Sequence, residues 1–466
     1  MKIFNLMALF VAGAVLSGCK IVVSAEPPSS SQSKASSSDS GTGVSPTPTS
    51  TPSSTPTQPS ASPSSSPAVS PTVSPTPPEQ MGGCDPGSKQ DGSEESPIQI
   101  SDPDQFIEVF GKGEPGKAYI LCSSLDFEGK DISSLPDFSG ILDGNQQSIA
   151  SLTINGPGLF RSLKEAKVMG LTLKGITVKP NRDGSAGILA GSGTDVDLLG
   201  NAIYDSNLVS GYKGALGSFL GHMANSSRPG TFQKNRVAKT LLRTRVKEQP
   251  IGGFIGILHA ENKVMHVISN NSIQTTIDAV ENTYCVGGMI GYASQGQIIE
   301  NQVDTEFLSP GIYARAGGLL GCTQLGDGST TIELRSNSVH FNELIGNWFG
   351  RVGGLIGAIE TGNGSVKAVS NWIDGKVDAA HEETKGMLFG HLDQGSFGGD
   401  SNYWSLAGGD LKDYQSCFND CNSIASGLQK DEAAMSGVPF PGGEWSDQNV
   451  WNFQKGAYPE LLPVPK

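Results

Sequence analysis

Seven short hydrophobic segments, each framed by glycine, recur along residues 186–391 of this chain. Their closing glycines lie 30, 35, 35, 30, 36 and 33 residues apart. A period of this length predicts a solenoid of stacked coils, each packing only on its neighbours, rather than a globular enzyme core. Function is therefore expected on a surface of the solenoid. The segments are residues 186–191, 216–221, 252–256, 287–291, 317–321, 353–357 and 385–390.

Asparagines form a second marker in step with the glycines. From Gly221 onward, one asparagine follows each closing glycine by ten to sixteen residues. Equivalent side chains in stacked parallel strands lie about 4.8 Å apart, so their amides can hydrogen-bond along a ladder. We interpret these asparagines as structural, and the alternative is a polar column that contacts a ligand. They are Asn235, Asn271, Asn301, Asn337, Asn371 and Asn402.

The two markers predict an all-β fold, because stretches of Val, Ile and Thr alternate with Gly- and Asn-rich turns. The predicted architecture is a parallel β-helix-like solenoid of coils of about 30–36 residues. Within the glycine segments both middle positions are apolar, as at Phe254 and Ile255. Strict strand alternation would place one of each pair in water. The chain is therefore expected either to bend at the glycines or to carry an element that covers that face.

The glycine segments resemble the GLUG repeat, whose core reads Gly-Leu-any-Gly. Residues 318–321 and 354–357 match this core, and residues 253–256 and 288–291 are near matches. The first two segments of the chain depart from it. The resemblance covers roughly residues 118–461. It implies a bacterial surface-exposed, β-helix-like repeat domain, of a kind often found beside adhesins or IgA-peptidase-type surface proteins.

The N-terminus predicts export. Residues 3–16 form an apolar stretch, shorter than the roughly 20 residues of a membrane-spanning helix and therefore typical of a cleaved signal peptide. The next residues, Leu16, Ser17, Gly18 and Cys19, resemble a bacterial lipobox. That resemblance implies lipidation of Cys19, with palmitate among the acyl chains, and an anchor in the bacterial envelope, at a surface-exposed outer-membrane position. The alternative is an ordinary secretory signal with an unrelated cysteine.

Composition and repeats divide the chain into five parts. Residues 1–18 are the predicted lipoprotein signal peptide. Residues 19–80 are rich in Ser, Pro and Thr and bury too little apolar surface to fold, which predicts a disordered tether. Residues 81–185 are the predicted N-terminal cap and first coils, residues 186–402 the GLUG-like repeat β-helix, and residues 403–466 the C-terminal cap.

The charge of the chain limits its partners. Its formal net charge is -14. Proteins that bind nucleic acid or anionic lipid need a basic stripe, so we expect no nucleic-acid partner. The expected partners are the membrane, through the lipid anchor, and a surface glycan or protein ligand.

No catalytic or metal site emerges from the sequence, and no cofactor is predicted. The zinc helix of IgA-type peptidases needs two histidines four residues apart with a glutamate between them. The nearest string begins at His381, and Lys385 stands where the second histidine belongs. One missing ligand removes the site, so we reject peptidase activity.

A polysaccharide lyase or hydrolase is the enzymatic alternative. Such enzymes line a groove with paired carboxylates from successive coils. Acidic side chains at turns and presumed outer faces could supply the pair, although solvated carboxylates on an acidic protein explain them equally. They are Asp304, Glu306, Asp374, Asp378, Glu382 and Glu383.

Apart from Cys19 the chain has six cysteines, which in an exported protein suggests disulfides among 15 arrangements. Two candidate pairs are Cys84 with Cys122, and Cys417 with Cys421. In aligned glycine segments Cys285 and Cys322 occupy columns seven residues apart. In an extended strand this is about 23 Å, far beyond disulfide reach. We expect Cys285 and Cys322 to be unpaired.

These observations predict a lipid-anchored β-helical protein of the bacterial cell surface that acts by binding, in the manner of an adhesin, and not by catalysis. Two alternatives remain. One is a polysaccharide-cleaving β-helix enzyme, and the other is a purely structural spacer in the envelope.

The lipobox gives a direct prediction. The Cys19→Ser chain, expressed in a Gram-negative host, should incorporate no labelled palmitate and should leave the detergent-extracted membrane fraction, because Cys19 is the only predicted acylation site. The Cys417→Ser chain is the control and should keep both the label and the membrane fraction. Palmitate incorporation into the Cys19→Ser chain would contradict the lipobox.

Overall fold

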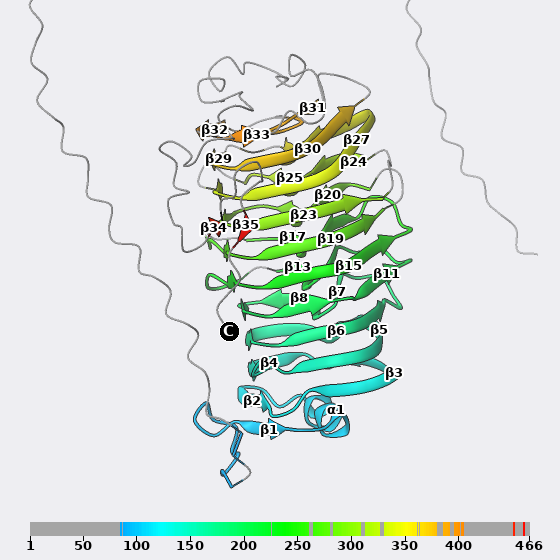
Figure 1. Cartoon of the computed structure of the whole chain (residues 1–466), viewed down its shortest axis with the longest axis vertical. Coiled ribbons are helices and arrows are strands. Elements are labelled where there is room, and N and C mark those ends of the chain that lie inside the picture. The colour runs from blue at the N-terminus through cyan, green and yellow to red at the C-terminus, as the bar shows by residue number, and fades with distance from the viewer. Residues whose placement is uncertain are drawn as a thin grey trace, which may run out of the picture. The chain divides into compact units, whose positions relative to one another are not determined.

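In a computed structural model that describes residues 84–404, with short internal gaps, and residues 451–452 and 460–461, the described chain forms a stack of β-strands (Figure 1). Within these residues every strand pair of the large sheet is parallel, and each strand pairs with its equivalent in the next coil, as β19 does with β15 and β23. The chain therefore folds as a parallel β-helix, as its glycine period predicts.

The elements have the following bounds. The helix α1 is Pro103–Lys112. The strands up to the fifteenth are β1 (Ile98–Ile100), β2 (Lys117–Leu121), β3 (Leu125–Leu135), β4 (Phe138–Asp143), β5 (Ser148–Met169), β6 (Thr172–Lys179), β7 (Ala186–Gly187), β8 (Ala190–Thr194), β9 (Asp197–Leu199), β10 (Ala202–Tyr204), β11 (Asn207–Ser210), β12 (Leu216–Gly217), β13 (Leu220–Met223), β14 (Thr231–Gln233) and β15 (Arg236–Thr244). The later strands are β16 (Pro250–Gly252), β17 (Ile255–Leu258), β18 (Val267–Ser269), β19 (Ser272–Asp278), β20 (Cys285–Gly287), β21 (Ile290–Ala293), β22 (Gly296–Ile299), β23 (Gln302–Phe307), β24 (Tyr313–Gly317), β25 (Leu320–Gln324), β26 (Thr331–Arg335), β27 (Ser338–Gly353), β28 (Ile356–Glu360), β29 (Ser365–Val369), β30 (Trp372–Ala379), β31 (Lys385–Gly386), β32 (Ser396–Asp400), β33 (Tyr403–Trp404), β34 (Trp451–Asn452) and β35 (Glu460–Leu461).

Each repeat supplies one coil with the same four strand positions. In one coil these are β16, β17, β18 and β19, and they pair in order with β20, β21, β22 and β23 of the next. The glycine segment spans the first two positions, and its glycines stack directly, as Gly252 does on Gly287. The first two segments, which depart from the GLUG core, lie in the same columns, with Gly187 opposite Gly217.

The glycine segments are bends, which resolves the two alternatives that their apolar pairs left open. Phe254 and Ile255 are both fully buried, because the chain turns between its two strands and directs both side chains inward. The two arms of the bend meet at backbone distance. A Cβ on Gly321 would lie 2.5 Å from the backbone N of Val286 and 2.7 Å from the carbonyl carbon of Cys285. Only glycine fits there.

The same bend overturns the expectation that Cys285 and Cys322 are unpaired. They form a disulfide, with their Cα atoms 5.4 Å apart. The glycine columns align as predicted, and Cys322 stacks on Tyr292 of the preceding coil. Seven residues of straight strand would separate the two cysteines by about 23 Å, but the chain is not straight between them. Because the chain folds back at the glycines, those seven residues return Cys322 to the strand that contains Cys285.

The asparagines form a continuous buried ladder. The Oδ1 of Asn301 accepts hydrogen bonds from the backbone N of Asn271 at 3.0 Å and from its Nδ2 at 2.9 Å. The Nδ2 of Asn301 donates to the carbonyl of Ile268 and to Oδ1 of Asn337, at 2.9 and 3.0 Å. All six predicted members take part, and each is almost fully buried, so they contact no ligand. Asn201, which the sequence reading missed, begins the ladder.

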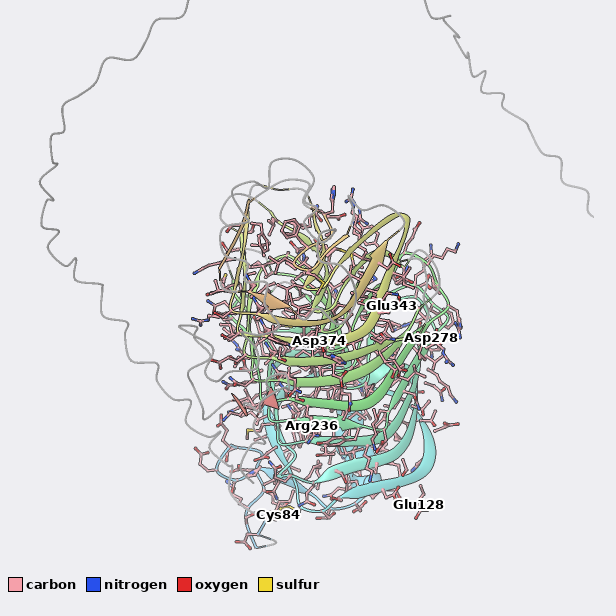
Figure 2. All side chains as sticks on the ribbon, turned by 45° about the horizontal axis from the view of Figure 1, so that its top comes forward. Cys84, Glu128, Arg236, Asp278, Glu343 and Asp374 are labelled. Atoms are coloured by element: carbon pink, nitrogen blue, oxygen red, sulfur yellow. A yellow bond between two sulfur atoms is a disulfide. The ribbon has the colours of Figure 1, made fainter. Side chains whose placement is uncertain are left out.

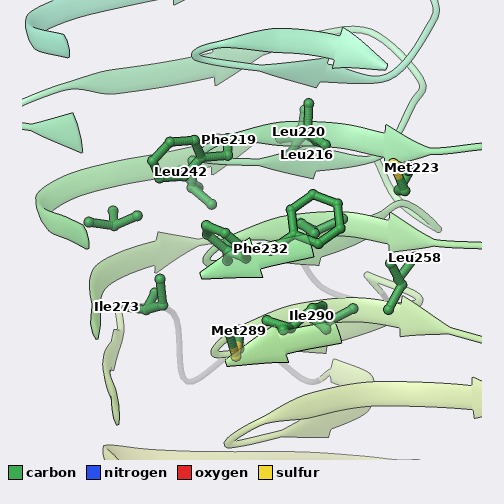
Figure 3. Packing of buried hydrophobic residues seen from close by; sticks show 14 of the residues in the cluster. Leu216, Phe219, Leu220, Met223, Phe232, Leu242, Leu258, Ile273, Met289 and Ile290 are labelled. Atoms are coloured by element: carbon green, nitrogen blue, oxygen red, sulfur yellow. The ribbon is translucent and has the colours of Figure 1, made fainter. Parts of the chain in front are cut away.

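The interior of the helix is a stack of apolar layers. Figure 3 shows side chains of neighbouring coils, among them Phe219, Phe232 and Met289, one above another in the core. Phe219 packs edge-on against Phe254, with ring centroids 5.0 Å apart. Each coil therefore buries its apolar surface mainly against the coils on either side.

A helical cap covers the first coils. The side chain of Asp102 accepts a hydrogen bond from the backbone N of Gln105 and so begins α1, whose Phe106 and Phe110 are buried. Phe110 packs against Phe160 of β5, with ring centroids 5.3 Å apart. Cys84 is joined to Cys122 by a disulfide with a Cα separation of 5.6 Å, which is the pairing suggested by the sequence.

Several predictions concern residues outside the described part of the chain. These are the signal peptide with Leu16, Ser17, Gly18 and Cys19, the tether to residue 80, the pair Cys417 and Cys421, the string from His381 with Glu382 and Glu383, and most of the C-terminal cap. Among the described residues, no helix has the length and apolar character that crossing a membrane requires.

The ladder gives a prediction about stability. Asn301→Ala should lower the free energy of unfolding by at least about 2 kcal/mol, because it leaves the buried amide groups of Asn271 without an acceptor. The exposed Gln274→Ala is the matched control and should change stability by less than about 0.5 kcal/mol. Urea unfolding followed by circular dichroism measures both. Equal midpoints for the two variants would contradict a stabilising ladder.

Candidate ligand-binding cleft

A cleft opens on the side of the N-terminal coils. It consists of two adjoining pockets, of about 410 and 490 Å³, that share Pro157, Arg161, Asn181 and Arg182 in their walls. The first pocket is also lined by Pro180, Asp183, Gly184, Ser185, Gly191, Ser192 and His222, and the second by Ser133, Ser134, Pro136, Asn155 and Gly156.

Successive coils and one turn build this cleft. Arg161 lies on β5, and residues 180–185 form the turn between β6 and β7. Ser192 of β8 pairs with Ser162 of β5 on one side and with His222 of β13 on the other. A Cβ on Gly191 would lie 2.7 Å from Cβ of Pro157. Glycine at this position therefore lets the chain pack closely under the cleft.

The cleft is locally basic on an acidic protein. Nε of Arg161 lies 3.1 Å from Asp137, and Nζ of Lys164 lies 2.7 Å from the same carboxylate. The hydrogen bond from Lys164 lowers the pKa of Asp137. Asp183 in the wall accepts a hydrogen bond from the backbone N of Lys213 at 2.9 Å. Both carboxylates are thus already bound within the protein.

Arg182 and His222 offer nitrogen atoms to a ligand. Arg182 is exposed, and among the described residues its guanidinium forms no ion pair or hydrogen bond. His222 also lines the first pocket. Burial, with a smaller contribution from nearby His259, lowers the pKa of His222 below 6.5, so its imidazole is mainly neutral at pH 7. A neutral imidazole can donate one hydrogen bond and accept another.

Further along the helix the same outward column is filled. In register, His222 is followed by Ile257, Tyr292 and Cys322. There the Cys285–Cys322 disulfide packs against Tyr284 and Tyr292. The cleft is therefore open in the N-terminal coils and closed by packed side chains in the later ones.

An ion-pair cluster lies beside this disulfide. Glu360 pairs with Arg315 and, at 3.6 Å, with Arg351, and it accepts a hydrogen bond from the hydroxyl of Tyr284 at 3.1 Å. The Arg315 guanidinium lies 4.2 Å from the centroid of the Tyr284 ring. Burial raises the pKa of Tyr292 to about 12. This phenol is therefore protonated near neutral pH and is a poor proton acceptor.

The carboxylates of the enzymatic alternative are not gathered in this cleft. Asp304, His340 and Asp374 stack in one column of the sheet that contains β23, β27 and β30. Figure 2 labels Asp374 and, from the neighbouring coil, Glu343. Asp304 and Asp374 belong to coils two steps apart, about 10 Å, with His340 between them.

The candidate carboxylates that lie among the described residues either bind neighbouring side chains or face solvent. Nδ1 of His340 lies 2.9 Å from Oδ2 of Asp374. Gln274 donates to Asp304 at 3.3 Å, and Thr276 donates to Glu306 at 3.2 Å. Asp378 is exposed near the end of β30. In the described part of the chain, no three His, Cys, Asp or Glu side chains are grouped as a metal site would require.

The sequence reading missed Arg161 and Arg182 as candidate site residues. The bridge between Ile356 and Phe389 continues the column of His222 to His391, and Ser162 and Ser192 precede His222 in that column. The missed signal was the positive charge at Arg182, in the turn just before the first glycine segment.

Comparisons with known proteins give little further help. No family model matches the chain, so the GLUG assignment stays a prediction, and no curated protein matches it. A solved structure described as "IgA1 Protease" is similar over 57% of this chain and 21% of that chain, with 16% sequence identity and a TM-score of 0.36. The match thus spans about a fifth of that protein.

The column of Asp304, His340 and Asp374 predicts how His340 titrates. The hydrogen bond to Asp374 raises the pKa of His340 above 6.5. Because the folded-state pKa is the higher one, the pair stabilises the fold fully below pH 6.5, and this contribution is lost as the pH rises through the raised pKa. NMR titration should show the raised pKa in the unaltered protein and a lower one in Asp374→Asn. A pKa of His340 unchanged by Asp374→Asn would contradict the pairing.

Proposed function

We propose that this chain is a non-catalytic, adhesin-like binding protein of the bacterial cell surface, which holds its ligand in the cleft of its N-terminal coils. The observation that carries the proposal is the open cleft with the guanidinium of Arg182 in its wall, which pairs with none of the described residues. Volumes of about 410 and 490 Å³ fall within the range of small-ligand sites. Arginine is a common anchor in binding surfaces.

Display at the surface is the second part of the proposal. It rests on the lipobox ending in Cys19 and on the tether of residues 19–80. A polyproline-like tether of this composition could extend on the order of 170 Å. Such a length would carry the cleft well away from the anchoring membrane and toward partners on other surfaces.

The cleft favours binding over the two alternatives. A glycan-cleaving enzyme needs two carboxyl groups about 5–9.5 Å apart across the scissile bond. The cleft walls contain one carboxylate, Asp183, and it is already bound to a backbone amide. A structural spacer does not need an open cleft with an arginine that pairs with none of the described residues. Such a cleft adds nothing to the packing of one coil on the next.

A binding screen tests this proposal. The full chain, purified in mild detergent, should bind at least one member of a glycan and whole-cell array, and Ser192→Trp should abolish that binding by filling the cleft. Ser192 is partly exposed on β8, so the variant should fold. The same protein should release no sugars from a polysaccharide panel. Sugar release would establish the enzymatic alternative, and an array without any signal would favour the spacer.

A further inference from the structure

We infer that the cleft selects an oligosaccharide that carries a single carboxylate, with Arg182 and Arg161 binding the acidic group and the hydroxyl and amide side chains binding the sugar hydroxyls. This inference rests on the proposed function and specifies its ligand.

The charged side chains of the cleft favour a ligand with one anionic group. Arg161 and Arg182 line both pockets. Asp137 pairs with Nε of Arg161 at 3.1 Å, and no hydrogen bond from the terminal nitrogens of that guanidinium is formed with the described residues. Arginine binds carboxylates in a two-pronged geometry that gives specificity as well as affinity.

The rest of the molecule restricts how much negative charge the ligand carries. The chain has a formal net charge of -14. Such a field repels a polyanion along most of its length, whereas a short local basic region attracts a single anionic group. The cleft therefore fits an oligosaccharide with one acidic sugar better than a uniformly charged polymer.

The remaining walls suit sugar hydroxyls. Serine and asparagine side chains predominate, from Ser133, Ser134, Asn155, Asn181, Ser185 and Ser192. His222, neutral at pH 7, adds a donor and an acceptor at one end. The described lining contains no Phe, Tyr or Trp, so recognition depends on charge and hydrogen bonds rather than on stacking.

An acidic peptide fits the same cleft less well. Peptides commonly bind by adding a strand to a free sheet edge, with pockets for alternate side chains. Here β8 is paired on both sides, by β5 and by β13, so its backbone offers no free edge. The cleft also lacks an aliphatic or aromatic pocket, since its apolar lining is mainly proline.

The experiment compares oligosaccharides that differ in one acidic group. Isothermal titration of the full chain uses cellobiouronic acid against cellobiose, and sialyllactose against lactose. An acetylated and amidated Gly-Glu-Gly peptide and polygalacturonate are added as the peptide and polyanion probes. At least one acidic oligosaccharide should bind about tenfold or more tightly than its neutral partner and than either added probe.

Two variants locate the binding. Arg182→Gln should weaken binding of the acidic oligosaccharide about tenfold to a hundredfold, because it removes a charged donor that forms no hydrogen bond or ion pair with the described residues. Arg236→Gln is the matched control. Arg236 is exposed on β15 and lines neither pocket, its guanidinium 5.7 Å from the centroid of the Tyr204 ring, and its replacement should change the dissociation constant less than twofold.

The outcomes separate the inference from the proposed function. Binding of the neutral partners with equal affinity, or binding unaffected by Arg182→Gln, would overturn the carboxylate inference while the binding function stands. Equal affinity for the acidic peptide or for polygalacturonate would also overturn it. If the glycan and whole-cell array and all these probes fail to bind, the proposed function fails as well.

Discussion

The rest of the structure depends on one close contact, the meeting of two backbone arms at the glycine bends. At Gly321 the second arm of one coil lies against the first arm of the coil before it, with no room for a side chain. This contact directs both middle residues of each segment into the core, and it sets the angle at which the chain continues around the coil. The asparagine ladder performs a complementary task at another corner, where the preceding residues, such as Asn270 and Glu300, adopt positive φ angles of 56°. Glycine allows the backbones of neighbouring coils to approach closely. Asparagine provides hydrogen-bond partners for the buried backbone amides that the tight corner leaves without strand partners.

What repeats in the chain could be predicted, because repetition converts sequence spacing into spatial columns. The glycine period, the parallel β-helix and six members of the ladder follow from equivalent positions in successive coils. The disulfide between Cys285 and Cys322 could not be predicted in the same way, since distance along a strand says nothing once the strand bends. The candidate cleft is even harder to predict from the sequence. Arg161 comes from a strand and Arg182 from a later turn, and the glycine repeat marks neither as a site residue, so only the folded chain brings them together.

The outward column beside the bends shows how one repeated architecture can serve two purposes. In the later coils it carries Tyr292 and Cys322, and the Cys285–Cys322 disulfide packs there against Tyr284 and Tyr292, which links neighbouring coils. In the first coils the same column carries Ser192 and His222 and is left open. Side chains that would otherwise stabilise the stack are absent where a ligand is proposed to enter. Under the proposed binding function, packing between coils and ligand recognition would lie at different heights of the stack.

The asparagine ladder has a consequence for how such a molecule can vary in size. Each amide receives hydrogen bonds from the coil before it and donates to the coil after it, so every internal rung is chemically equivalent to the next. Removing or duplicating one whole coil would leave every remaining rung with a complete set of partners and change the height by about 4.8 Å. Residues can also be inserted in the turns without breaking the ladder, since successive asparagines 30 to 36 residues apart in the sequence pair in the same way. The height of the stack is therefore adjustable only in whole coils, whereas the length of each coil can vary.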